Sequence, residues 1–584
     1  PTPTPTPTPG PNATQLENAK TGTAEWAIPN SAVALNREIE GYASATSINR
    51  GESINLYVNT SDTTYTVSVY RYGWYGGLGG RMISTSQAPI PGIVQSTCDH
   101  DTSTHLVECS WQSNYTITAN NPSDPTDWPS GYYLAKLTGE PSGKQSYIIF
   151  VVRDDNRASD FLFQSSVTTY AAYNGWTDIK DADGKFVNYG SYSTPQAKRV
   201  SFNRPYQVVN PSNRRELKGA GFFLEWESSM VRFIEREGYD VSYNTNIDTH
   251  AAGNQLLKYK AFLSVGHDEY WSMDMRNNVE NARDAGVNLA FLGANAAYWQ
   301  IRLDPSNAAN GAKPNRNIVA YKYDWGNDPA YRTDPQSQLV TRRFRDLPIK
   351  LPEASFIGVQ YIFNSLENAD MVISDCSSSL CDGTKSTADQ TKRLQPGDKF
   401  IGLLGYEVDG KDTSSPSNIQ TIAASPFTCP ANVQTSFPQL TCDGITQNFS
   451  HMTQYIAASG AKVFATGSMQ WNWGVDDSGP YGNALLNENV KQITRNVFNS
   501  FISAPPTRVV SKSAMPESMD NSSASVNSSA SGGGCTSDSL KPERIDMSML
   551  LLFVAAIVFR YRFCLRRTNS LVSRRAGSKH TRYI

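Results

Sequence analysis

The stretch AFLSVGHDEYWSMDMRNNVENARDAGVNLAFLGANAAYW, residues 261–299, decides the fold of this chain. Its first apolar run, 261–265, ends abruptly in glycine, as a buried parallel strand does. A helical pattern follows and ends at Gly286, and a second apolar run, 287–292, comes next. Strand, helix and strand in this order predict a βαβ unit, whose strands finish on the same edge of a parallel sheet. We therefore expect the segments after both strands to face one crevice, where open α/β sheets bind ligands.

The α/β pattern extends from residue 155 to residue 505. Helical periodicity predicts a helix over Phe222–Glu237 that ends before a glycine. Short apolar runs predict further strands over residues 161–164, 240–243, 400–404 and 462–465. The stretch 305–398 has little periodicity, and we interpret it as a long insertion.

The segment 31–154 has a different pattern, with short alternating runs separated by turn residues. This pattern is typical of an all-β sandwich of immunoglobulin-like size. Residues 1–30, which open with PTPTPTPTPGP, are interpreted as a Pro/Thr-rich linker. Because the chain begins with Pro and shows no signal peptide, we expect an upstream leader that this sequence does not include.

Cysteine usage and charge place the chain in a broad class. Six of the eight cysteines form close pairs around polar segments, which predicts three local disulfides in an exported protein, with six reduced thiols as the alternative. The predicted pairs are Cys98–Cys109, Cys376–Cys381 and Cys429–Cys442. The 52 basic and 54 acidic residues give a net charge of -2, so no nucleic-acid partner is expected.

The composition of the C-terminal end predicts a membrane or sorting segment. A Ser/Gly-rich linker, 506–546, leads to a hydrophobic segment, 547–565, and a basic tail, 566–584. The apolar core of 13 residues is shorter than the roughly 20 that span a bilayer, but flanking arginines can snorkel. This order of parts resembles bacterial GlyGly-type sorting signals, so we expect a secreted or cell-surface protein, anchored or processed through this tail. A plain membrane anchor is the alternative.

Oxygen-bearing side chains gather where the predicted strands end. Tyr270 follows the first strand, Tyr298 follows the second, and Glu407 follows the run 400–404. The loops of the βαβ unit add four further polar candidates: His267, Asp268, Glu269 and Asn295. Anionic oxygens in one crevice suit a hard, highly charged cation, and a neighbouring carboxylate can act as general base. Each tyrosine alone is more often a packed or hydrogen-bonded aromatic than a ligand, so a metal site and plain packing both stay open at this point.

Four motifs between residues 161 and 501 carry a resemblance to a known family. They are SFNRPY at 201–206, GHDEYW at 266–271, LGANAAYW at 292–299 and SGAKVFATGS at 459–468. The region resembles the large (beta) subunit of N,N-dimethylformamidase, above all its C-terminal part. Upstream, YRYGWYGG at 70–77 resembles the β-sandwich segment that accompanies such domains.

The resemblance implies a glutamine-amidotransferase-like (flavodoxin-like) parallel-sheet domain preceded by an immunoglobulin-like sandwich. It also implies one Fe3+ ion, held by two tyrosines and one glutamate, that hydrolyses a small N-substituted formamide. On the matching motifs the iron ligands fall on Tyr270, Tyr298 and Glu407. A small subunit accompanies the family enzyme and is not evident in this chain, and a homo-oligomer is left open.

Two functions follow from these observations. The first is an exported, iron-dependent hydrolase that cleaves the C–N bond of a small amide or formamide, with His267, Asp268, Glu269 and Asn295 as catalytic candidates. The alternative is a non-catalytic cell-surface protein that keeps the fold and binds carbohydrate or peptide. It rests on the predicted sandwich, the Pro/Thr- and Ser-rich spacers and the C-terminal tail, and on four tryptophans predicted to line the crevice, Trp271, Trp299, Trp471 and Trp473.

Overall fold

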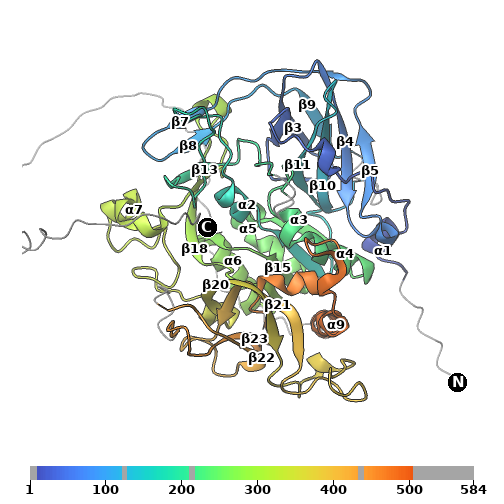
Figure 1. The fold of residues 1–584 in the computed structure, drawn as a ribbon, viewed down its shortest axis with the longest axis vertical. Helices are drawn as coiled ribbons and strands as arrows, with labels where there is room; N and C mark the ends of the chain where they lie inside the picture. The colour runs from blue at the N-terminus through green and yellow to red at the C-terminus, as the bar shows by residue number, and fades with distance from the viewer. Residues whose placement is uncertain (1–9, 121–127, 210–216, 432–439, 504–584) are drawn as a thin grey trace, which may run out of the picture. The chain divides into compact units, whose positions relative to one another are not determined.

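A seven-stranded sheet forms the centre of the α/β region (Figure 1). The strand order is β14-β12-β15-β17-β24-β23-β22, in which the first five strands pair in parallel and the last two are added through antiparallel pairings. The bounds are β12 Phe161–Ser165, β14 Val241–Thr245, β15 Ala261–Gly266, β17 Asn288–Gly293, β22 Gln420–Phe427, β23 Asn448–Ile456 and β24 Lys462–Ala465. The fold is therefore of the mixed α/β class.

The predicted βαβ unit is confirmed. Strands β15 and β17 pair in parallel, with Ala261 opposite Asn288, and helix α6 (Met273–Asp284) connects them. The side chain of Ser272 accepts a hydrogen bond from the N–H of Met275 at 3.1 Å and so caps the first turn of α6. The helix ends before Gly286, whose φ of 95° is the left-handed conformation that glycine adopts easily.

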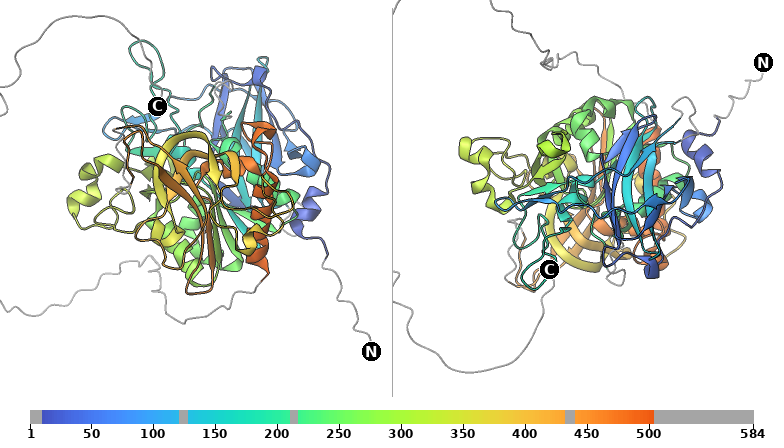
Figure 2. Two further views of the ribbon diagram at one scale, coloured as in Figure 1. Left: turned by 60° about the horizontal axis from the view of Figure 1, so that its bottom comes forward. Right: turned by 90° about the horizontal axis from the view of Figure 1, so that it is seen from above.

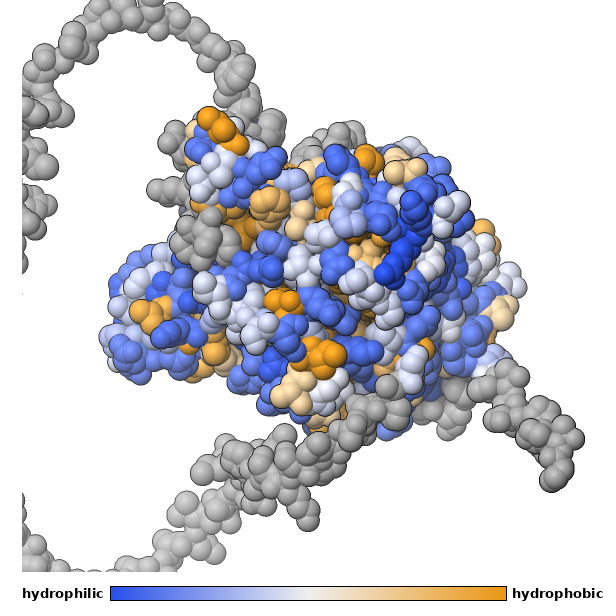
Figure 3. All heavy atoms as spheres, turned by 90° about the horizontal axis from the view of Figure 1, so that it is seen from below, coloured by the Kyte–Doolittle hydropathy of each residue, from blue (hydrophilic) through white to orange (hydrophobic). Residues whose placement is uncertain are grey.

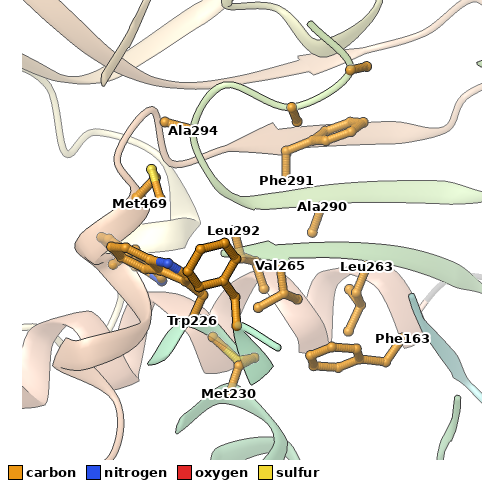
Figure 4. Packing of buried hydrophobic residues seen from close by; sticks show 14 of the residues in the cluster. Phe163, Trp226, Met230, Leu263, Val265, Ala290, Phe291, Leu292, Ala294 and Met469 are labelled. Carbon is orange, nitrogen blue, oxygen red and sulfur yellow. The ribbon is translucent and has the colours of Figure 1, made fainter. Parts of the chain in front are cut away.

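Large apolar side chains fill the space between the sheet and its helices. Figure 4 shows Leu263 and Val265 of β15 and Leu292 of β17 beside Met230 and Trp226. The other helices are α1 Ala13–Asn18, α2 Val167–Tyr173, α3 Phe223–Trp226, α4 Ser228–Arg236, α5 Asn246–Ala251, α7 Pro329–Thr333, α8 Ala354–Ile357 and α9 Glu488–Ile502.

The segment before residue 155 forms two main sheets that enclose a second core. Their strand orders are β1-β3-β9 and β2-β11-β10-β4-β5, and inward side chains such as Leu56, Val67 and Phe150 are fully or almost fully buried. The bounds are β1 Ile39–Ala43, β2 Ser47–Asn49, β3 Ser53–Thr60, β4 Thr64–Tyr72, β5 Gly80–Thr85, β6 Ile90–Pro91, β7 Asp99–Asp101, β8 Leu106–Glu108, β9 Tyr115–Thr118, β10 Gly131–Glu140 and β11 Gln145–Arg153.

The computed structural model describes residues 10–120, 128–209, 217–431 and 440–503. All of them belong to the first of two units, 1–511 and 512–584. The linker 506–546, the hydrophobic segment 547–565 and the basic tail 566–584 lie outside the described residues. Across the described ranges, no helix is long and apolar enough to span a membrane. The face drawn in Figure 3 is mainly hydrophilic, with hydrophobic residues in small separate patches.

The structure differs from the sequence prediction in three elements. Helix α1 lies within the predicted linker 1–30, and its N-cap Asn12 donates a side-chain hydrogen bond to the carbonyl of Gly238 at 2.9 Å. The helix predicted over Phe222–Glu237 is two helices, α3 and α4, because the backbone turns at Glu227. The third difference concerns the run 400–404.

Residues 400–404 do not form a strand of the parallel sheet. They belong to β21 (Lys399–Gly410), which pairs antiparallel with β20 (Gln360–Val372) from the predicted insertion 305–398. This two-stranded ribbon lies beside β22 and β23 (Figure 2). A separate four-stranded sheet has the order β13-β19-β18-β16, with bounds β13 Arg199–Ser201, β16 Tyr270–Ser272, β18 Trp299–Asp304 and β19 Asn317–Val319.

The three predicted disulfides are confirmed: Cys98–Cys109, Cys376–Cys381 and Cys429–Cys442. Each one closes a short loop of the chain, with sequence separations of 11, 5 and 13 residues.

Candidate functional site

Glu269 lies at the centre of a buried polar cluster at the carboxyl edge of β15. The chain turns at Gly266, with φ of 72°, where a Cβ atom would come within 2.7 Å of Trp226. Only glycine fits this turn. Behind it, the N–H of Glu269 donates to the Thr169 hydroxyl of α2 at 2.9 Å, and the Glu269 side chain is fully buried.

Two tyrosines converge on the carboxylate of Glu269. The hydroxyl of Tyr173, the last residue of α2, donates to Oε2 at 2.8 Å, and the hydroxyl of Tyr192 donates to Oε1 at 3.1 Å. The two rings stack with centroids 4.6 Å apart. Burial and the nearby Glu269 carboxylate hold the pKa of both phenols well above the usual value of a tyrosine. Both phenols are therefore protonated, and they donate hydrogen bonds to Glu269, when no cation is bound.

His267 joins Glu269 to a second carboxylate, Glu407 of β21. Its Nε2 lies 3.2 Å from Glu269 Oε2 and 3.0 Å from Glu407 Oε2. Burial lowers the pKa of His267, but Glu407 and Glu269 together raise it to about 10. His267 is therefore an imidazolium between two carboxylates. Asn295 donates from Nδ2 to Glu407 Oε2 at 2.9 Å and so orients that carboxylate.

A buried lysine borders the cluster. Lys322 Nζ donates to the Tyr270 hydroxyl at 3.0 Å and lies 3.2 Å from the centroid of the Tyr192 ring. Burial lowers the pKa of Lys322 to about 7, against the attraction of Glu269. Tyr270 also contacts the phenols of the cluster directly: its ring lies edge-on to that of Tyr173 with centroids 6.1 Å apart, and burial together with the neighbouring Tyr192 and Glu269 raises its pKa well above the usual value of a tyrosine.

Asp268 belongs to a different hydrogen-bond network. Its Oδ1 accepts from Asn246 at 2.9 Å, and its Oδ2 accepts from Gln164 at 2.7 Å and from Ser264 at 2.9 Å. These partners come from α5, β12 and β15, so the side chain connects elements of the core. The geometry fits a structural role better than the catalytic role expected from the sequence.

Tyr298 packs against Tyr361 and Arg345. Its ring meets Tyr361 at 5.1 Å between centroids and lies 5.1 Å from the Arg345 guanidinium carbon. Of the residues predicted from sequence, the structure brings together His267, Glu269, Asn295 and Glu407, with Tyr270 at their border. Sequence reasoning missed Tyr173, Tyr192 and Lys322.

One of the missed tyrosines had a usable signal. Tyr173 follows the predicted strand 161–164 at the same sheet edge as Tyr270. Because open α/β sheets bind ligands beyond the carboxyl ends of their strands, Tyr173 was a candidate on the same ground as Tyr270. Tyr192 lies in an irregular loop before β13, and no periodicity in the sequence points to it.

The donor set of Glu269, Tyr173 and Tyr192 fits a hard, highly charged cation. Across the described ranges, no group of three or more His, Cys, Asp or Glu side chains has the arrangement of a metal site, so phenol oxygens would have to take part. A cation here would replace two phenolic protons and meet two phenolates and one carboxylate. Three anionic oxygens suit a trivalent ion such as Fe3+, for which phenolate is a known ligand.

The four tryptophans expected to line the crevice are buried. Trp271, Trp299 and Trp471 are at most 1% exposed. Trp473, at 4% exposure, stacks on Trp226 with centroids 4.7 Å apart. Their faces are occupied by protein, so the expectation that they stack on sugars or peptides is wrong.

Comparison with known proteins finds one matching family. The family model for the C-terminal region of N,N-dimethylformamidase beta subunit-like proteins matches residues 66–485. The N,N-dimethylformamidase beta subunit of Alcaligenes sp is 22% identical over 449 residues, which cover 69% of this chain and 55% of the relative. That of Paracoccus aminophilus is 23% identical over 453 residues, which cover 69% and 56%. The chain thus spans about half the length of these curated relatives.

Among solved structures, the mmIFT52 N-terminal domain aligns with 46% of this chain and 87% of its own length, at 9% identity. The TM-score of 0.24 is too low for this likeness to support any conclusion.

Proposed function

Because the chain belongs to the N,N-dimethylformamidase beta subunit-like family through its C-terminal region, we propose that it hydrolyses the C–N bond of a small amide or formamide. We further propose that the reaction depends on a ferric ion held by Tyr173, Tyr192 and Glu269. The observation that carries the proposal is the convergence of two phenol hydroxyls on the buried carboxylate of Glu269, at 2.8 Å from the half-buried Tyr173 and at 3.1 Å from Tyr192, which is 48% exposed.

The ligand set differs from the one that the sequence motifs implied. Tyr270 accepts from Lys322 and Tyr298 packs on Tyr361, whereas Tyr173 and Tyr192 both reach Glu269. When bound, a ferric ion would act as a Lewis acid on the amide carbonyl and lower the pKa of a coordinated water.

Two neighbouring side chains are assigned to the two proton transfers of the reaction, Glu407 as the base and His267 as the acid. The contacts of Glu407 with Asn295 and His267 both fall on Oε2. We assign Glu407 Oε1 as the general base that takes a proton from the attacking water. His267, held as an imidazolium by two carboxylates, is assigned as the proton donor to the leaving amine. Asn295 keeps the Glu407 carboxylate in position.

The surroundings favour a small substrate. Aromatic rings pack around Glu269, and its carboxylate and the side chains of His267 and Asn295 are all less than one-tenth exposed. A small neutral amide reaches such buried side chains more readily than a polymer does. Both relatives are named as beta subunits, which supports partnership of this chain with a further subunit.

Three further assignments belong to this proposal. The five parallel strands support a glutamine-amidotransferase-like sheet domain, and the two facing sheets before it support an immunoglobulin-like sandwich. The three disulfides support export to an oxidising compartment. Anchoring or processing through residues 547–584 rests on the sequence alone.

Metal analysis of the full chain, with its visible spectrum, tests the ligand set. We expect near-stoichiometric iron, a tyrosinate-to-iron absorption band and release of formate from small formamides. Tyr192→Phe should lose the iron and lower turnover more than about a hundredfold, because Lewis-acid activation is worth several kcal/mol.

Tyr298→Phe is the matched control, since it removes one phenol from a ring that packs on Tyr361 and beside Arg345. It should keep both the iron and the activity. Loss of iron in Tyr298→Phe, with iron retained in Tyr192→Phe, would return the ligands to the set predicted from sequence. A wild-type chain that takes up no iron and cleaves no formamide would end the proposal.

A further inference from the structure

A partly open cavity lies between the β-sandwich and the α/β region. It is a cavity of about 30 Å³, walled on the sandwich side by residues of β1 and β11 such as Tyr42 and Ile148. On the other side it is lined by Tyr170 of α2 and by Arg204, Tyr206 and Arg316. A water molecule needs roughly 10–15 Å³ of such space, so the cavity has room for one small ion or about two waters.

Two buried guanidinium groups face this cavity without a carboxylate partner. Arg204 is 2% exposed and Arg316 is 6% exposed. Among the described residues neither takes part in an ion pair, whereas the similarly buried Arg71 and Arg276 do. Guanidinium groups stay protonated in proteins, and burying such a charge without a counter-ion is costly.

The hydrogen-bond acceptors of these two arginines are neutral, so they do not balance the positive charge of the guanidinium groups. Arg204 donates from Nη1 and Nη2 to the backbone carbonyls of Asn174, Trp176 and Tyr189, but its buried Nε has no hydrogen-bond acceptor among the described residues. Arg316 donates to the amide oxygen of Asn203 and to the carbonyl of Ala43. Burial lowers the pKa of Arg204 to about 9 and that of Arg316 to about 10, and in Arg316 burial outweighs the opposing effect of nearby tyrosines and of Glu108.

We propose that this cavity binds one small monovalent anion of the halide class, such as chloride, between Arg204 and Arg316. The anion supplies the missing negative charge, and the cavity volume limits it to a single small ion. This inference does not rest on the proposed hydrolase activity, because it uses none of the residues around Glu269.

The first test compares thermal unfolding of the full chain in sodium chloride and in sodium gluconate at equal ionic strength. We expect the melting temperature to rise with chloride and to saturate, and bromide to reproduce the rise, because a ligand bound only to the folded state stabilises it. Gluconate is too large for the cavity and should give no saturable rise. Equal curves in chloride and gluconate would mean simple charge screening and would overturn the proposal.

Arg316→Met should abolish the rise in melting temperature that is specific to halide, while the methionine keeps most of the side-chain volume. The matched control is Arg276→Met, which removes an equally buried arginine that already pairs with Glu280 at 2.6 Å. The control should lower the melting temperature in both salts and keep the rise with chloride. An undiminished chloride effect in Arg316→Met would contradict the assignment.

A direct measurement covers the case in which Arg316→Met does not fold. Crystals of the wild-type chain soaked in bromide should show an anomalous peak in the cavity between the two guanidinium groups. A bromide-soaked crystal with no peak there would overturn the proposal, whatever the variants do.

Discussion

Glu227 is a buried acid at the break between α3 and α4. Its Oε1 accepts a hydrogen bond from the N–H of Ser166 at 3.1 Å, and its Oε2 accepts one from the hydroxyl of Tyr132. Among the described residues no cation pairs with it. Burial therefore outweighs these hydrogen bonds and raises its pKa from 4.5 to about 7.

This carboxyl should make stability depend on pH. Between pH 4.5 and about 7 the unfolded chain releases the proton of Glu227 while the folded chain retains it, so the free energy of unfolding falls as pH rises through this window. The loss is complete above the folded pKa and is on the order of 3 kcal/mol. Glu227→Gln should remove this part of the pH dependence.

Urea unfolding of wild type and Glu227→Gln from pH 4.5 to 8 measures the effect. The stability of the variant relative to wild type should increase with pH. Burial of His451 lowers its pKa to about 4, which gives a slope of opposite sign in an overlapping window, but His451 is present in both proteins and cancels in the difference. Parallel curves for the two proteins would contradict the assignment of the slope to Glu227.

At the residue scale, sequence could predict only part of the site. His267, Glu269 and Asn295 were accessible because each follows a strand of the βαβ unit, and strand order fixes where they lie. Tyr192 and Lys322 were not accessible, because irregular segments bring them to Glu269 and Tyr270 through tertiary packing alone. The iron ligands implied by the motif match, Tyr270 and Tyr298, stay a prediction beside the set proposed from the geometry, since adjacency in sequence does not tell which way a tyrosine points.

At the scale of elements, the ribbon β20–β21 decides where Glu407 lies. Its register shifts at several points between Tyr361 and Met371, and Gly405 occupies a φ of 141°. A Cβ atom at Gly405 would come within 1.7 Å of the Leu366 carbonyl oxygen and 2.2 Å of Gln470 Oε1. Only glycine allows the two strands to approach this closely, two residues before Glu407.

Gly405→Ala should therefore destabilise the chain by about 2 kcal/mol or more, through backbone strain and overpacking. It should also lower turnover more than iron content, because Glu407 moves while Tyr173, Tyr192 and Glu269 stay in place. Gly326→Ala is the control, since no atom lies within 4 Å of a Cβ at that site. Denaturant unfolding, iron content and formate release check the three effects, and wild-type behaviour of Gly405→Ala in all of them would refute this role of the ribbon.

The ribbon also explains one error of prediction. A five-residue apolar run before a glycine is typical of a buried parallel strand, yet Ile401 within it is 65% exposed. The partner strand β20 is irregular in register, and no alternation in the sequence reveals it. By contrast, β15, β17 and β24 were predictable, because strands buried on both faces leave continuous apolar runs.

At the scale of the described unit, the sandwich and the α/β region share buried polar contacts. Arg71 of β4 and Glu235 of α4 form a fully buried ion pair at 2.7 Å. Tyr243 donates to Glu235 Oε1 at 2.9 Å, and Asn18 of α1 donates to Glu235 Oε2 at 3.0 Å. Three parts of the chain thus meet at one carboxylate, and the helix in the predicted linker is one of them.

Removing one partner of this pair should be costly. Glu235→Gln leaves Arg71 buried without its ion-pair partner, so we expect a loss of about 3–5 kcal/mol in the free energy of unfolding. Asp370→Asn, which breaks the more exposed pair with Lys399 at 3.2 Å, should cost less than about 1 kcal/mol.

Unfolding of the wild-type chain should be a single transition by both near- and far-UV circular dichroism, because the sandwich and the α/β region share one apolar cluster. Two separate transitions in the wild type would contradict this coupling.

The position of β24 late in the sequence also determines when the central sheet can be completed during synthesis. Strand β17 pairs with β15 on one side and with β24 on the other, where Leu289 lies opposite Val463. A ribosome that has translated β17 has therefore made a strand whose second edge stays open until residues 462–465 emerge. Open strand edges are templates for aggregation. A chain released early, after Glu407 but before Lys462, would hold every residue assigned to the site and still expose an unpaired edge in the middle of its sheet.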